Sequence, residues 1–129
     1  MPSTAIAPET FALFVQPDGR FRLLHWGTVR TPEHALCCDT ARPVDLTTQL
    51  TMWIDQDYPE LCQQINRPAM ALVGLFRPEQ HQQLLTGDVV FTGTTDAHGH
   101  ALGLTEAQAV LLIGRYLERP ANLPPQQRP

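Results

Sequence analysis

The residues with the clearest chemical potential in this sequence are Asp96, His98 and His100, which lie within one short stretch. In an extended segment, residues two apart point to the same side, so this carboxylate and both imidazoles would reach one metal ion. The competing interpretation is a solvent-facing turn made by Asp96 and Gly99. The sequence has neither a paired Cys-x-x-Cys nor a His-Glu-x-x-His motif. We therefore expect no metal and no other cofactor, and keep a metal-dependent enzyme centred on this loop as the alternative function.

A second reactive pattern is the adjacent pair Cys37 and Cys38, with His34 four residues before Cys38. Positions four apart adjoin on a helix, so a thiolate–imidazole pair is one interpretation. The other is a buried cysteine with a surface histidine. An odd total of 3 cysteines is not a disulfide framework, and free thiols are typical of a reducing compartment, so we expect a cytoplasmic protein.

Composition limits the classes of partner. The chain has 129 residues and a formal net charge of −4, which argues against binding a phosphate backbone. No apolar run approaches the ~20 residues that span a bilayer, so we expect neither nucleic acid nor a membrane as partner. The expected organisation is a frayed N-terminus over 1–9, a single domain over 10–119 and a disordered, proline-rich tail over 120–129.

Alternation of apolar residues predicts five strands. The turn signal Pro17-Asp18-Gly19 joins the first two strands into a hairpin. In the stretch 50–55, Leu50, Met52 and Ile54 would face the core, as in a half-buried antiparallel strand. The expected strands are 10–16, 20–26, 43–47, 50–55 and 88–92.

Capping signals predict the helices. Thr31 begins a short helix that ends near Cys38, Asn66 caps a second helix, and Pro78 precedes a helical stretch over 79–85. Thr105 and Gln108 form a capping box at the start of the longest helix, 105–118. Its apolar stripe consists of Ala109, Leu112, Ile113, Tyr116 and Leu117. The expected fold class is α+β: an antiparallel sheet of about five strands packed against a C-terminal helix and one or two shorter helices.

Trp53 falls on the polar side of its strand by strict alternation. An exposed tryptophan is a common anchor of protein interfaces, so we expect a partner-binding surface formed by Trp53, Asp55, Asp57 and Tyr58. A homodimer across a two-fold axis is one form that such a surface would support. The alternative is that a helix covers this side as well and makes Trp53 a core residue.

Short stretches between residues 11 and 113 form a pattern of turn glycines, caps and core residues. On these stretches the sequence resembles a family of small actinobacterial and phage proteins known only as a domain of unknown function. The resemblance implies a free-standing domain, common in GC-rich bacteria and on mobile elements, and implies no reaction. The stretches are Phe11-Ala12-Leu13 with Asp18-Gly19, Val44-Asp45-Leu46, Leu50-Thr51-Met52-Trp53-Ile54-Asp55, Asn66 with Ala69, Gly87-Asp88-Val89-Val90-Phe91-Thr92-Gly93, Asp96 with Gly99, and Leu102-Gly103-Leu104-Thr105.

No catalytic set emerges from these positions. The sequence favours a small, non-enzymatic binding or accessory protein that acts through protein–protein contacts, in phage–host or plasmid biology.

Overall fold

The structure is a computed structural model that describes residues 9–29, 31–56, 64–80 and 84–118. The expected tail over 120–129 and all of the expected frayed segment except Glu9 lie outside this part of the chain. The elements are β1 (Phe11–Val15), β2 (Phe21–His25), α1 (Trp26–Val29), α2 (Pro32–Leu36), β3 (Ala41–Thr47), β4 (Leu50–Asp55), α3 (Arg67–Phe76), the 3₁₀ turn η2 (Pro78–Gln80), β5 (Val89–Thr92) and α4 (Glu106–Leu117).

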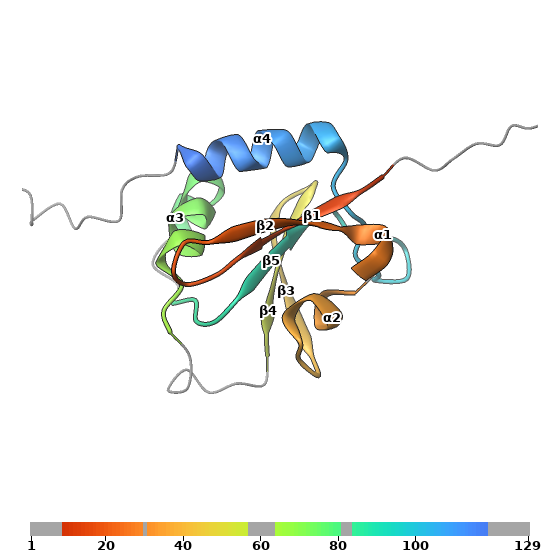
Figure 1. Ribbon diagram of the computed structural model, residues 1–129, viewed down its shortest axis with the longest axis horizontal. Coiled ribbons are helices and arrows are strands. Elements are labelled where there is room, and N and C mark those ends of the chain that lie inside the picture. Colours follow the sequence, from red (N-terminus) through yellow and green to blue (C-terminus); the bar gives the residue numbers. More distant parts are fainter. Residues whose placement is uncertain (1–8, 30, 57–63, 81–83, 119–129) are drawn as a thin grey trace, which may run out of the picture.

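The five strands form one sheet in the order β2-β1-β5-β4-β3, and every neighbouring pair is antiparallel. Helices lie on both sides of this sheet, with α4 above it and α2 below it in Figure 1. The α+β class, the five-stranded antiparallel sheet and the C-terminal helix are therefore confirmed. The expected helix over 79–85 is wrong in its described part, because only Pro78–Gln80 form a 3₁₀ turn.

Each face of the sheet has its own core. On the first face, Leu13, Val15 and Phe91 pack with residues of α3 and α4. On the second face, Phe14 and Trp53 belong to a cluster that also contains residues of α1, α2 and the loop after β5. Strand β4 is consequently buried on both sides through most of its length, and its expected half-buried character is wrong. The alternation of apolar and polar residues did not predict this burial, because helices and a loop cover the second face of the sheet as well.

A buried asparagine joins three parts of the fold. Asn66 is fully buried, and its Oδ1 accepts the first-turn amide of Ala69 at 3.0 Å, which caps α3. Its Nδ2 donates to the carbonyl oxygen of Val15 at 3.1 Å and to that of Gly87 at 2.8 Å. The side chain thus fixes the start of α3 against the end of β1 and the approach to β5, and it satisfies carbonyls that would be costly to bury unpaired.

Two glycines let the segment after β5 return to β1. A Cβ on Gly103 would lie 2.5 Å from Cβ of Thr10, and one on Gly93 would lie 2.9 Å from the carbonyl oxygen of Gly103. This close approach allows Phe11 and Leu104 to exchange two backbone hydrogen bonds, at 2.7 and 2.8 Å. Glycines of the resemblance pattern therefore have a packing role at these positions.

Helix α4 lies along β1 and is fixed at both of its ends. Its N-terminal end follows directly from the Phe11–Leu104 bridge, and the capping box of Thr105 and Gln108 is formed as expected. At its other end, the Tyr116 hydroxyl donates to the carbonyl oxygen of Gly19 at 2.7 Å. Leu112 and Tyr116 are buried, whereas Leu117, expected in the buried stripe, is 63% exposed.

Substitutions in α4 test this packing. Leu112→Ala should lower the free energy of unfolding by about 2–5 kcal/mol, because it removes buried methyl groups from the main core. Thr105→Ala should cost about 1 kcal/mol through the lost cap. Chemical denaturation measures both, with the exposed Val110→Ala as the control that should change stability by less than about 0.5 kcal/mol. A Leu112 variant as stable as wild type would refute the packing.

Candidate functional site

Trp53 is a core residue in the structure. Its side chain is only 6% exposed, and its Nε1 donates to Oγ1 of Thr92 at 2.9 Å. Leu36 of α2 and Ala101 of the loop after β5 belong to the same buried cluster. The expectation that Trp53 is an exposed anchor is therefore wrong, because local alternation carries no information on what packs over a face.

The other residues of that expected surface do not form a described site. Asp55 is partly buried at the end of β4, while Asp57 and Tyr58 lie outside the described residues.

The histidine loop is a turn organised by Asp96. Its Oδ1 accepts hydrogen bonds from the backbone amides of His98 and His100 at 2.8 and 2.9 Å. Both hydrogen bonds lower the pKa of Asp96, and the one from His100 has the larger effect. Gly99 has a φ of 82°, and the two imidazole centroids lie 6.1 Å apart. Among the residues that the structure describes, no group of three His, Cys, Asp or Glu side chains is arranged to hold a metal ion.

The cysteine pair lies at the end of α2. Cys37 is exposed and takes the left-handed conformation that ends the helix, with a φ of 53°. Its Sγ lies 3.9 Å from the backbone carbonyl oxygen of His34. Cys38 is partly buried and packs against the second core. Thr31 caps α2 through its Oγ1, so the local signals for this helix are confirmed.

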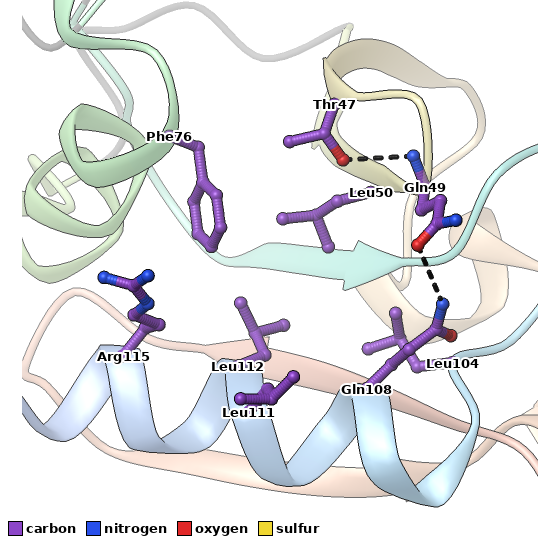
Figure 2. Close-up of a pocket in the computed structure, with 9 residues that line it drawn as sticks. All are labelled: Thr47, Gln49, Leu50, Phe76, Leu104, Gln108, Leu111, Leu112 and Arg115. Carbon is purple, nitrogen blue, oxygen red and sulfur yellow. Dashed lines mark hydrogen bonds between the residues drawn. The ribbon is translucent and has the colours of Figure 1, made fainter.

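The structure forms a pocket of about 220 Å³ between α4, the turn that joins β3 to β4, and the end of α3 (Figure 2). The buried side chains of Leu50, Leu104 and Leu112 lie at its base, and the Phe76 ring projects from α3 beside them. The exposed Leu111 belongs to its wall. The remaining lining residues are Thr47, Gln49, Gln108 and Arg115.

Polar contacts hold the rim of this pocket in shape. Oγ1 of Thr47 accepts the amide of Gln49 at 3.0 Å, which tightens the turn between β3 and β4. Nε2 of Gln108 lies 3.5 Å from Oε1 of Gln49, and Oε1 of Gln108 accepts the amide of Thr105. Gln108, the second residue of the capping box, therefore also links the helix to the turn across the pocket mouth.

Arg115 supplies the charge of this site. Its side chain is exposed, and its guanidinium has no hydrogen bond or ion pair to any residue that the structure describes. The nearby Arg77 differs, because its guanidinium contacts the Glu79 carboxylate and donates to the carbonyl oxygen of Asp45. The pocket thus combines an apolar base, amide groups and the cation of Arg115, which are groups suited to binding a ligand.

Sequence reasoning missed this pocket. One signal was present: Val110 and Leu111 are apolar residues outside the expected stripe of the C-terminal helix, so the helix carries more apolar surface than one buried face needs. The residues that complete the pocket come from distant segments, and the Gln49–Gln108 contact spans 59 positions.

Two carboxylates lie near the opposite end of the sheet. Asp88, directly before β5, is partly buried, and this burial raises its pKa above the ordinary value of 3.8. The Asp18 carboxylate raises the pKa of Asp88 further, and Arg22 partly offsets both effects. Asp18 is itself paired with Arg20 at 3.3 Å. The charged form of Asp88 is therefore less favourable in the folded protein than in the unfolded chain.

Comparison with known proteins gives one match. Residues 10–120 match a family model described as Domain of unknown function (DUF3846). No curated protein and no solved structure matches the chain. None of the helices in the described ranges is both long enough and apolar enough to cross a membrane.

Asp88→Asn tests the carboxylate pair. Because the folded state raises the pKa of Asp88, it holds the proton more tightly than the unfolded chain, so this group costs stability as pH rises above about 3.8. We expect the asparagine variant to be more stable than wild type at pH 7, by less than about 1 kcal/mol because solvent screens the group, and this gain should shrink as pH falls. Denaturation at several pH values measures it, with the exposed Asp39→Asn as control. A gain that does not vary with pH would contradict the assignment.

Proposed function

The chain belongs to the family described as Domain of unknown function (DUF3846), and on that premise we propose that it acts as a non-enzymatic binding module for another protein. The pocket beside α4 receives one apolar side chain of the partner. This proposal moves the partner surface from Trp53 to the outer flank of α4.

The size of the pocket carries the proposal. Pockets for drug-sized small molecules occupy about 300–1,000 Å³, whereas this one has about 220 Å³. A volume of that order suits a single leucine, phenylalanine or similar anchor, which is how hot-spot residues of protein interfaces dock. The buried leucines at its base and the Phe76 ring give the anchor apolar contacts on several sides.

The surroundings of the pocket support the same function. Leu111 is 70% exposed at its wall, although it is apolar and lies on a well-capped helix. Thr47, Gln49 and Gln108 surround the apolar base with neutral polar groups. An apolar centre with a polar rim is the usual arrangement of a protein–protein contact.

Arg115 adds a preference for charge. Its guanidinium, which has no partner within the described part of the chain, lines the pocket, and arginine binds carboxylates in a bidentate manner. A partner segment with an acidic residue beside its apolar anchor would satisfy both parts of the site. The overall charge of −4 repels most acidic proteins, so this local cation selects the place where an acidic group is accepted.

The wider setting is part of the proposal. The resemblance to actinobacterial and phage domains supports a role in phage–host or plasmid biology. The free cysteines Cys37 and Cys38 support a cytoplasmic location.

Selection of linear peptides from a random display library against the full chain tests this function. Selected peptides should share one large apolar residue next to an acidic one. Leu111→Lys should weaken their binding at least tenfold, which corresponds to about 1.4 kcal/mol, because it places a charge on the apolar wall. Val110→Lys is the matched control, since Val110 is 63% exposed on the same helix and does not line the pocket.

Peptides that bind both lysine variants as tightly as wild type would contradict the proposal. So would a selection that yields no peptide with an apolar anchor.

A further inference from the structure

The two edges of the sheet differ in how they are protected. Edge strand β3 contains Pro43, which has no amide to donate, and its pairing with β4 shifts register between Asp45 and Thr47. Arg77 also donates to the carbonyl oxygen of Asp45 at 3.0 Å. Proline, irregular pairing and side chains that occupy edge carbonyls are the devices by which proteins prevent a further strand from adding.

Edge strand β2 has none of these devices. Its sequence is Phe-Arg-Leu-Leu-His, and its register with β1 is regular over all five residues. Trp26 donates its amide to Thr10, and Arg20 accepts an amide through its carbonyl oxygen, so the even-numbered residues direct their backbone groups toward β1. The amides and carbonyls of Phe21, Leu23 and His25 therefore point away from the sheet, where the described chain places no other strand.

Exposed apolar side chains lie beside this open edge. Leu23 is on the α4 side of the sheet, since Phe21 shares its face and the Phe21 ring packs 5.0 Å from that of Tyr116. Leu23 is 38% exposed. At 100° per residue, Val110 and Leu117 lie on the flank of α4 opposite the pocket, which is the β2 side. Each of these two residues is 63% exposed.

We infer that a second copy of this chain pairs antiparallel with β2, about a two-fold axis perpendicular to the sheet at Leu23. In this register Leu23 faces its own counterpart, and Phe21 faces His25 of the second copy. Each of the three outward-pointing residues of β2 then exchanges two backbone hydrogen bonds with the residue opposite it in the second copy. The result is one continuous sheet through both copies, with Val110 and Leu117 of each copy beside the junction.

Symmetry favours a second copy as the occupant, and charge favours the register centred on Leu23. An antiparallel strand pair is self-complementary, so the open edge of one copy matches the same edge of a second copy. Moving the register by two residues in either direction loses one of the three pairs, and in one direction it also places Arg22 opposite itself. In the register centred on Leu23, Arg22 faces Leu24, and its guanidinium already lies 5.2 Å from the Phe14 ring centroid of its own copy.

Sedimentation velocity of the full chain over a concentration series tests this inference. Wild type should form a dimer, and Leu23→Lys should raise the dimer dissociation constant at least tenfold, because it places two like charges opposite each other at the axis. Leu111→Lys, on the pocket flank, is the matched control and should dimerise as wild type does. The same Leu111→Lys variant is expected to weaken peptide binding in the test of the proposed function. The dimer and the peptide site can therefore be confirmed or refuted independently of each other.

Amide hydrogen exchange keeps the inference testable if the Leu23 variant fails to fold. In wild type, exchange at Phe21, Leu23 and His25 should slow as concentration rises, whereas Arg22 and Leu24 should be protected at every concentration. The inference would be overturned if exchange at the three outward amides did not change with protein concentration up to about 1 mM. A dimer that forms only above this concentration has less than about 4 kcal/mol of binding free energy. A dimer that Leu23→Lys leaves intact would overturn it too.

Discussion

The position of α4 along β1 is the constraint on which both proposed binding surfaces depend. The Phe11–Leu104 bridge fixes its beginning, and the Tyr116–Gly19 hydrogen bond fixes its end. Between these points the buried face of the helix is committed to the sheet, so its two flanks must face different neighbours. One flank meets the turn between β3 and β4 and leaves a pocket, and the other lies beside the open edge of β2.

The sheet can hold α4 in this way because its interior is well connected. Asn66 ties α3 to β1 and to the approach to β5 through three hydrogen bonds, all within a fully buried environment. On the other face, Trp53 is hydrogen-bonded to Thr92 and packs against α2 and the loop after β5. A sheet buried on both faces leaves its edges and the outer surfaces of its helices as the places where partners can attach.

Local signals in the sequence identified most of the elements. Thr31, Asn66 and Thr105 each cap the helix that they were expected to cap, because capping depends on residues within one turn. The burial of Trp53, the pocket beside Leu111 and the open edge at Leu23 depend on contacts between distant segments. Strand order decides which edge is open, and nothing in the local pattern of Phe21–His25 reveals that β2 is at the edge. The turn of Asp96 and Gly99, in contrast, follows from local signals, since Oδ1 of Asp96 accepts backbone amides of its own turn.

The central claim is that α4 separates two independent binding surfaces, and methyl NMR spectra of leucine- and valine-labelled full chain test it most directly. Raising the protein concentration should shift the methyl signals of Leu23, Val110 and Leu117 and leave those of Leu111 and Leu50 in place. At fixed protein concentration, a selected peptide with an apolar anchor should shift the methyl signals of Leu111 and Leu50 and leave those of Leu23, Val110 and Leu117 in place. Shifts that spread equally over both groups of methyls in each experiment would contradict the account.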